Sequence, residues 1–393
     1  MECLKSKKGV LLEILLIVLP LTVQIYNIVA SKLGVHPFAG NLITLVILLM
    51  TALFVFLKNI GLLSRIGEYK ISVLFAISVL PAVLLNLDSD FEIIVRAFCS
   101  VSFVPLAFVL GGIICVQIKN ADKMLLYNIL LLLPMFSVTA MMQSMPMLIV
   151  GTDFGRDAIL AVSIFLPLIL AIKGKYLKGI LLIFVTYWSI ISAKRTAFLC
   201  VGLVFLFLFL SNMLSITIKS LFRFMGITIV LLGVGYYSYT NYPDFATQAD
   251  LIIGRFEDPE DNESNRERID MYQRAYTAFL SSTLLEQLFG HGYKAIERDL
   301  YGRPTHNDLL EILYDYGLIS LIVYLLFLIN LLAHGINMFR ANKQNIYLLF
   351  TIFNLLLLSM MNCMITNPVF VFVNNFCIGF SLNYFQESKS SSL

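Results

Sequence analysis

The chain has 393 residues, of which 59% are hydrophobic and only 13% are charged, and its mean hydropathy is +0.85. A soluble globular domain carries about 25% charged residues, so this composition excludes an ordinary soluble protein. Uncharged runs of roughly 17 or more residues recur along the sequence, the length that a helix needs to cross about 30 Å of hydrocarbon. These runs are apolar on every side rather than alternating with period two, which excludes a porin-like barrel. The net charge of +3 is small, and no nucleic-acid partner is expected.

The runs predict an all-α polytopic membrane protein with about twelve transmembrane helices. In chain order, the predicted spans are 10–30, 37–57, 71–87, 97–117, 124–142, 157–172, 179–193, 196–212, 223–240, 317–334, 346–366 and 369–385. The division of the last two rests on the short connection Thr366-Asn367-Pro368. The chain is thereby divided into nine spans within 1–240, one large loop over 241–316, and three spans with a tail over 317–393.

The lysines and arginines of the short loops set the orientation, because cytoplasmic loops are enriched in these residues. With the N-terminus in the cytoplasm, 16 of the cations fall on the cytoplasmic side and five in the short outer loops. The C-terminus is then cytoplasmic as well, and the large loop lies outside. The first span has a basic flank but no small-residue cleavage site, so no cleavable signal peptide is predicted.

The six cysteines are scattered through apolar segments with no CxxC spacing. Cysteines in such positions usually pack as small apolar side chains. Neither a disulfide framework nor a zinc site is predicted, and no metal or other cofactor is expected.

Lys194 and Arg195 depart from the charge pattern, because they are adjacent in a tight outer turn between the seventh and eighth spans. In one interpretation, the two side chains extend into the lipid headgroup region and leave their aliphatic stems on apolar surface. In the other, they form an anion-binding site at the outer interface. The residues alone leave both interpretations open.

The outer loop begins with a segment, 241–306, that contains twelve acidic and seven basic residues, so it is not a generic basic patch. Within it, Ser264-Asn265-Arg266-Glu267 is a capping-box pattern that predicts the start of a helix. Arg268 lies at the edge of the apolar face of that helix and Arg274 on its far side. This face consists of Ile269, Tyr272, Tyr276, Phe279 and Leu280. The pattern is typical of an interfacial helix that lies on the bilayer.

A second outer helix is predicted over 306–316, with Thr305 as its candidate cap. The acidic residues Asp308, Glu311 and Asp315 recur on one stripe and the aliphatic residues face elsewhere, which predicts an amphipathic helix at the outer surface. His306 would occupy the first turn, where the helix dipole favours the neutral imidazole that a general base requires. A single histidine in a loop is more often inert, so position alone does not assign it a catalytic role.

The run from His306 to Ile319 resembles the His-Asn-x-x-Leu…Gly-Leu-Ile signature of the O-antigen ligase and O-antigen polymerase superfamily. Members of that family build bacterial surface polysaccharide on the outer side of the inner membrane. Arg268 precedes an aromatic residue by four positions, as in the family, although Tyr272 stands where Trp is more usual. Two further segments are similar to the family's Ser-x-x-Arg-Thr/Gly-Ala turn and Gly-x-Gly: Ser192-Ala193-Lys194-Arg195-Thr196-Ala197 and Gly290-His291-Gly292. The histidine between the two glycines is a departure from the pattern.

The resemblance implies the architecture of the C-type membrane glycosyltransferases, with one helical periplasmic loop between spans nine and ten. It also implies a location in the bacterial inner membrane with the active site on the periplasmic face. The expected partners are undecaprenyl-diphosphate-linked oligosaccharides, as donor and acceptor, and membrane lipid. A chain-length regulator is a further candidate partner.

The resemblance further implies roles for the polar residues. His306 would take the proton of the acceptor hydroxyl, while Arg195 and Arg268 hold the departing diphosphate, because a guanidinium binds phosphate through two nitrogens and keeps its charge. Arg266 competes with Arg268 for this role, and the spacing favours Arg268. Asp308 and Glu311 have a second interpretation as partners of the helix dipole. The expected substrate contacts are Arg266, Arg303, Lys194, Asn307, Asp308 and Glu311.

The expected reaction is a metal-independent, inverting glycosyl transfer. An O-antigen polymerase is favoured, because the resemblance is loose and polymerases are the more divergent group. The alternative is an O-antigen ligase, which transfers glycan to lipid A core. A lipid-linked glycan transporter is disfavoured, because the spans hold almost no central charge and no repeated half is apparent in the sequence.

Overall fold

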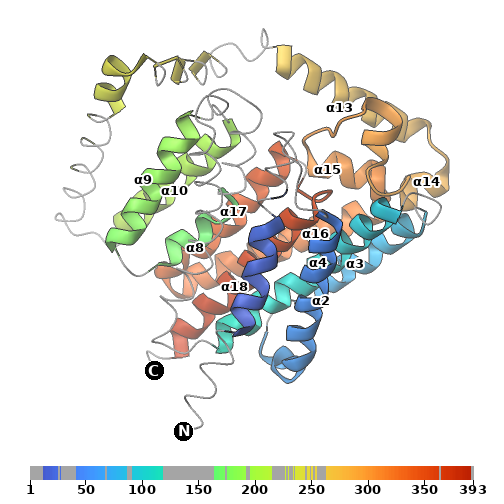
Figure 1. The fold of residues 1–393 in the computed structure, drawn as a ribbon, viewed down its shortest axis with the longest axis horizontal. Helices are drawn as coiled ribbons and strands as arrows, with labels where there is room; N and C mark the ends of the chain where they lie inside the picture. The colour runs from blue at the N-terminus through green and yellow to red at the C-terminus, as the bar shows by residue number, and fades with distance from the viewer. Residues whose placement is uncertain are drawn as a thin grey trace.

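The computed structural model describes residues 12–24, 27, 41–66, 69–85, 91–117, 163–172, 175–191, 195–214, 263–362 and 364–390, with scattered positions between 226 and 254. Within these ranges every regular element is a helix (Figure 1), which confirms the all-α class. The predicted span 124–142, half of the predicted span 223–240, and Lys194 lie outside the described residues.

Two stretches of the described residues are long and apolar enough to cross a membrane, Phe91–Gln117 and the helical run Asp308–Ala341. Shorter apolar helices accompany them: Leu12–Gln24, Leu42–Lys58, Tyr69–Leu84, Tyr176–Tyr187, Arg195–Ser211, Ile346–Met361 and Pro368–Asn383. The last two are separate helices, as the short Thr366-Asn367-Pro368 connection predicted. The total of twelve spans stays a prediction.

The helices of the first half are α2 (Asn41–Lys58), η1 (Ile60–Arg65), α3 (Tyr69–Leu84), α4 (Phe91–Gln117), α8 (Leu166–Ala171), α9 (Lys175–Ile191) and α10 (Arg195–Leu214). Those of the second half are α13 (Glu263–Ser281), α14 (Leu284–Phe289), η2 (Ile296–Tyr301), α15 (Asp308–Glu311), η3 (Ile312–Tyr316), α16 (Gly317–Ala341), η4 (Lys343–Asn345), α17 (Ile346–Met361) and α18 (Pro368–Ser390). Both η2 and η3 are short π-helical turns.

Helices α4 and α18 pack directly against each other at the centre of the described bundle. Glycine makes this approach possible on both sides. A Cβ atom on Gly111 would lie 2.2 Å from the Phe376 carbonyl oxygen, and one on Gly379 would lie 1.9 Å from the Phe108 carbonyl oxygen. Small residues at helix crossings allow close backbone contact in this way. Helices α2 and α3 pack on α4, while α16 and α17 pack on each other and on α18.

Helix α10 runs antiparallel to α17, and this fixes the level of Arg195. The Ser211 hydroxyl lies 3.4 Å from that of Tyr347, and one turn earlier in α10 the Phe207 ring centre lies 5.7 Å from that of Phe350. Followed away from these contacts, α10 leads back to Arg195, whereas α17 leads forward to its end at Met361. Arg195 therefore lies at the same end of the bundle as the turn between α17 and α18. Helix α15, which directly follows His306 and Asn307, packs on α17. We therefore call this end of the bundle the His306 end.

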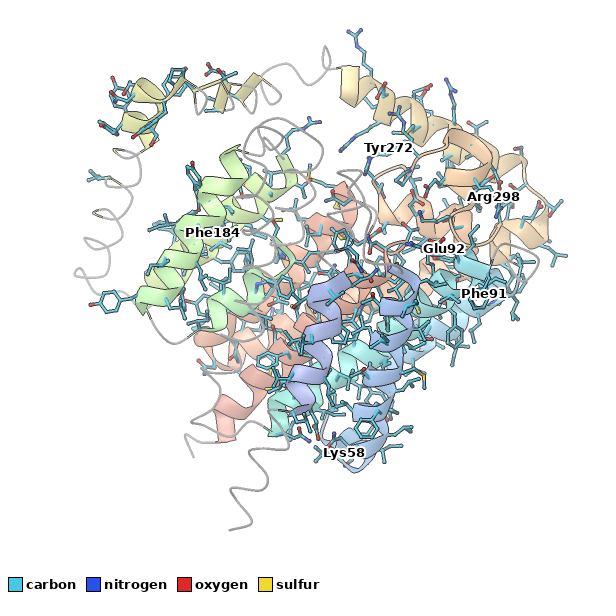
Figure 2. The ribbon with its side chains drawn as sticks, viewed as in Figure 1. Lys58, Phe91, Glu92, Phe184, Tyr272 and Arg298 are labelled. Carbon is cyan, nitrogen blue, oxygen red and sulfur yellow. The ribbon has the colours of Figure 1, made fainter. Side chains whose placement is uncertain are left out.

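Several cations predicted to be cytoplasmic lie at the opposite end. The Lys178 ammonium lies 5.7 Å from the centre of the Tyr347 ring, and Lys343 follows the end of α16. Lys58 forms an ion pair with the buried Glu13 carboxylate. Figure 2 shows Lys58 far from Tyr272 and Arg298, which belong to the outer segment. This separation of the two ends is the one that the predicted orientation requires.

Helices α13 and α14 cover the His306 end (Figure 1). Helix α14 packs on α3 and α16, while α13 packs on η2, η3 and α15. A small apolar cluster joins α13 to the segments below it, and it consists of Ala275, Phe279, Ala295, Ile296 and Tyr314. The outer segment is therefore a packed cover for the residues around His306.

Candidate active site around His306

His306 lies directly before the first cap of α15, in a backbone conformation that side chains rarely adopt. Its φ angle is +60°, and this left-handed region costs an ordinary residue about 1–2 kcal/mol. The Asn307 side-chain oxygen accepts the N–H groups of Leu309 and Leu310, at 2.9 and 3.3 Å. The sequence predicted Thr305 as the cap and His306 in the first turn. The structure differs by two residues, because asparagine is the stronger cap.

Thr305 is completely buried and is bound by a carboxylate from the next turn of the chain. Its N–H and its hydroxyl both donate to Oε1 of Glu311, at 2.6 and 2.9 Å. Asn307 is held independently. Its side-chain oxygen caps α15, and its backbone carbonyl accepts the N–H of Glu311 at 3.0 Å. The residues on both sides of His306 are thus fixed, and this explains how the strained conformation between them persists.

The Asp308 carboxylate binds the turn between α17 and α18. Its two oxygens accept the Ser359 hydroxyl and the N–H groups of Met364 and Ile365, the latter two at 2.7 and 3.0 Å. The side chain is 1% exposed. Three donors offset much of the cost of removing a carboxylate from water. The start of α15 is therefore attached to residues that follow it by more than fifty positions in the sequence.

Asp315 makes the third contact of this kind, because one of its oxygens accepts the N–H of Ile296 at 2.9 Å. Its second oxygen has no hydrogen-bond partner among the described residues. The predicted stripe of three acids is confirmed, but Asp308, Glu311 and Asp315 are each at most 1% exposed. The expected amphipathic helix at the outer surface is corrected accordingly: its acidic face is turned into the protein. Each acid binds a different segment around His306.

The arginines of the outer segment differ in direction. Arg268 is half-buried on the side of α13 that also carries the buried Met271, and α13 packs there on α15 and η3. Arg266 is exposed. Arg303 is exposed as well, and its Nη2 lies 3.2 Å from an oxygen of Glu267. Of the two arginines that compete for the same role, Arg268 is the one directed toward the covered region.

Arg195 is the first residue of α10 and is half-buried at the His306 end. The following Thr196 is 3% exposed. A helix N-terminus carries a partial positive charge, which adds to that of the guanidinium. The structure thus places His306, Arg268 and Arg195 at one end of the bundle, on three separate elements.

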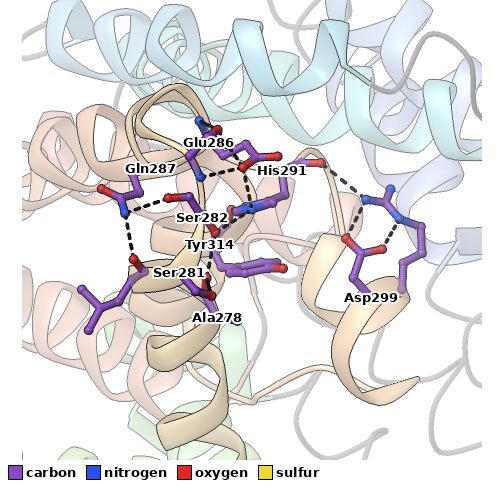
Figure 3. Close-up of polar contacts among 11 residues, drawn as sticks. Ala278, Ser281, Ser282, Glu286, Gln287, His291, Asp299 and Tyr314 are labelled. Carbon is purple, nitrogen blue, oxygen red and sulfur yellow. Dashed lines mark hydrogen bonds and ion pairs between the residues drawn. The ribbon is translucent and has the colours of Figure 1, made fainter.

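His291 is held in a cluster that the sequence did not reveal (Figure 3). Its Nδ1 donates to the Tyr314 carbonyl at 3.1 Å, and its Nε2 lies 2.9 Å from the Ser282 hydroxyl oxygen. The ring stacks on that of Tyr314, with centres 4.1 Å apart. The contacts join the end of α13 to η3, so we assign His291 a structural role. No spacing in the sequence distinguishes such a histidine from a catalytic one.

Two features support the position of His291. Hydrogen bonds from the Thr283 side chain and backbone hold the pKa of the Glu286 carboxyl below its ordinary value, and this carboxylate lies 4.0 Å from Nε2 of His291. Gly290 has a φ of +84°, and a Cβ atom there would lie 2.2 Å from the Asp315 carbonyl oxygen. Glycine is therefore required where the chain crosses η3.

Among the described residues, no group of three or more His, Cys, Asp or Glu side chains is arranged to hold a metal ion.

A comparison with protein-family models matches residues 179–325 to a family described as O-antigen ligase. The matched region covers just over a third of the chain, and it extends from α9 to the first part of α16. It contains Arg195, Arg268 and His306. A comparison with curated proteins gave no match.

Proposed function

We propose that this chain, whose residues 179–325 match the O-antigen ligase family, is an O-antigen polymerase. It joins oligosaccharide repeat units that are carried on a polyprenyl diphosphate, and it acts at the periplasmic face of the bacterial inner membrane. The observation that carries the proposal is the strained backbone at His306, which is fixed on both sides and lies at the same end of the bundle as Arg195 and Arg268. Strain of this kind is typical of functional residues.

The reaction follows from the residue types. His306 removes the proton of the acceptor sugar hydroxyl, whose oxygen then attacks the anomeric carbon of the donor glycan. The new glycosidic bond forms as the bond from that carbon to the diphosphate oxygen breaks, so the anomeric configuration inverts. The electron pair of the broken bond leaves with the polyprenyl diphosphate. The proton stays on the imidazole until the product leaves.

Arg268 and Arg195 bind the leaving diphosphate, and their fixed charge stabilises the negative charge that grows on it. In this proposal the reaction needs no metal ion, because the two guanidinium groups neutralise that charge. Arg266, Arg303 and Lys194 are proposed as auxiliary phosphate contacts.

Asn307, Asp308 and Glu311 belong to the site in a different way from the one expected. The Asn307 side-chain oxygen, both Asp308 carboxylate oxygens and Oε1 of Glu311 accept hydrogen bonds from the protein itself. We therefore propose that they hold His306 in position rather than bind sugar directly. Lys58, Lys178 and Lys343 lie at the end of the bundle opposite His306. Because cytoplasmic loops are enriched in lysine and arginine, this distribution supports a periplasmic site with both termini in the cytoplasm.

An O-antigen ligase is the second candidate, and the description of the matched family favours it. The two activities differ in acceptor, which is another lipid-linked repeat unit for a polymerase and lipid A core for a ligase. In a deletion strain, loss of a polymerase leaves core capped by single repeat units. Loss of a ligase leaves bare core, while lipid-linked polymer accumulates. The second pattern would overturn the polymerase assignment.

The site is tested in the same deletion strain by complementation with single variants. His306→Ala, Arg195→Ala and Arg268→Ala should each reach the membrane in normal amount yet yield no long glycan, since loss of a general base costs about 10²–10⁴ in rate. Arg274→Ala is the matched control, because Arg274 pairs with Asp270 on the far side of α13. Normal glycan length in the His306 variant would disprove the proposed mechanism.

A further inference from the structure

The surface of α13 is divided into three sectors. Met271, Ala275 and Phe279 are buried against the segments below. Roughly a third of a turn away, at about 100° per residue, a second apolar line is exposed. Its members Ile269, Tyr276 and Leu280 are 54%, 51% and 57% exposed. The remaining sector is polar and exposed, and it contains Asp270, Arg274 and Thr277.

The exposed apolar line continues onto α14. Leu284 and Leu285 are each 70% exposed, the highest values among the large apolar residues of the outer segment 263–316. A soluble surface rarely exposes a contiguous apolar area of this kind without a partner. The line does not belong to the core of the cover, because the side of α13 that carries Met271, Ala275 and Phe279 packs there instead.

The position of α14 identifies the partner. It packs on α3 and α16, two helices whose outward residues are themselves exposed and apolar. In α3 these include Leu80 and Leu84, at 41% and 60%, and in α16 they include Ile322 at 50%. In a membrane-embedded family, such side chains face lipid. The exposed residues of α14 extend this lipid-facing surface beyond the ends of the two helices.

We propose that α13 and α14 rest in the surface of the lipid bilayer at the His306 end, with Tyr276, Leu280, Leu284 and Leu285 among the headgroups and upper acyl chains. An interfacial helix buries its apolar side in this region and leaves its charged side in water. Tyrosine suits the boundary, because its ring is apolar and its hydroxyl is polar. The contact would hold Arg268 at the depth of a lipid diphosphate. This consequence rests on the proposed function, whereas the proposal that α13 and α14 contact lipid is independent of it.

The chain contains a single tryptophan, Trp188, which permits a direct fluorescence test. Leu285→Trp is introduced into a Trp188→Phe chain, and the full-length protein is placed in phosphatidylcholine vesicles whose acyl chains carry bromine. Tryptophan at 285 should lose roughly half or more of its emission, because an interfacial residue lies about 5–10 Å into the headgroup and acyl boundary. The matched control is Thr277→Trp on the polar sector, which should be quenched by aqueous iodide and little by the brominated lipid.

Equal quenching of the two variants by iodide would overturn the proposal, because position 285 would then face water. If neither iodide nor the brominated lipid quenches the emission of the Leu285→Trp variant, the proposal is also overturned. That result would indicate a protein contact at position 285, such as a second copy of the chain. A measurement on the unmodified protein avoids dependence on the Trp188 replacement. A phospholipid with a photoactivatable diazirine in its acyl chain should label residues 284–289 as it labels α16. Label on α16 alone would disprove the contact.

Discussion

Glu311 accepts two hydrogen bonds from Thr305, one from its N–H at 2.6 Å and one from its hydroxyl at 2.9 Å. Thr305 directly precedes His306. The Glu311 carboxylate, five residues after His306, therefore helps to fix the backbone from which the imidazole extends. Through these two bonds the carboxylate acts on the backbone beside the imidazole. This implies that the position of His306 depends on a backbone contact, and this can be tested without changing His306.

Replacing Thr305 with valine should impair glycan synthesis. Valine keeps the shape and the N–H but removes the hydroxyl, so the buried Glu311 carboxylate loses one of its two donors from Thr305. We expect a loss of about 1–3 kcal/mol in stability, and a displaced base reduces the rate by up to about 10²-fold. The glycan ladder and thermal unfolding in detergent measure the two effects. Thr305→Ser keeps the hydroxyl and should restore the ladder. If both variants give the same ladder, the hydroxyl does not position His306.

The strain at His306 predicts a difference between two inactive variants. His306→Ala keeps the cost of the left-handed conformation, whereas glycine adopts φ = +60° freely. Glycine also loses more entropy on folding, so the advantage of His306→Gly over His306→Ala should be about 1 kcal/mol. Both proteins should fail to make long glycan. Equal unfolding temperatures for the two would show that the residue is not strained in the folded protein.

Removal of the Asp308 carboxylate should destabilise the protein strongly. Asp308→Ala leaves the N–H groups of Met364 and Ile365 buried without their acceptor, at a cost of about 2–5 kcal/mol. Asp270 supplies the control, because it is an exposed acid whose pair with Arg274 is worth at most about 1 kcal/mol. The yield of folded protein in detergent and its unfolding temperature report the difference. A mild effect at position 308 would mean that the turn is held by other contacts.

The glycine contacts between α4 and α18 predict different outcomes for two glycine-to-alanine variants. Gly379→Ala places a methyl group where the Phe108 carbonyl oxygen already lies, and overpacking of this kind costs about 1–3 kcal/mol or more. Gly202→Ala in α10 meets no atom within 4 Å, so it should fold as the parent does. Size-exclusion chromatography of the two variants in the same detergent compares them. Similar elution and yield would contradict the close contact of the two backbones.

The sequence predicted the elements that depend on local pattern. The helical class, the separation of α17 from α18, and the acidic stripe on 308–316 follow from composition and periodicity. The cap at Asn307 was missed by two residues, because Thr305 was the predicted cap although asparagine is the stronger capping residue. Family resemblance singled out His306, Arg195 and Arg268, but position alone could not.

The direction of the apolar and acidic faces could not be predicted. On α13, Ile269 and Tyr276 were expected to share one face with Phe279, whereas the structure buries Phe279 and exposes the other two. Periodicity identifies an apolar face but does not say whether protein or lipid covers it. Likewise, the burial of Asp308 depends on donors at Met364 and Ile365, more than fifty residues away, which no local pattern reveals.

The attachment of Asp308 to the turn after α17 has a consequence for biogenesis. The amide groups that satisfy this carboxylate are synthesised after it, so the nascent chain must present Asp308 to the membrane surface before any of them exist. Until α17 enters the bilayer and the turn forms, the carboxylate can remain only in water. His306 would therefore acquire its final backbone geometry late, after insertion of the last helices, so that under the proposed function an incompletely assembled chain is inactive.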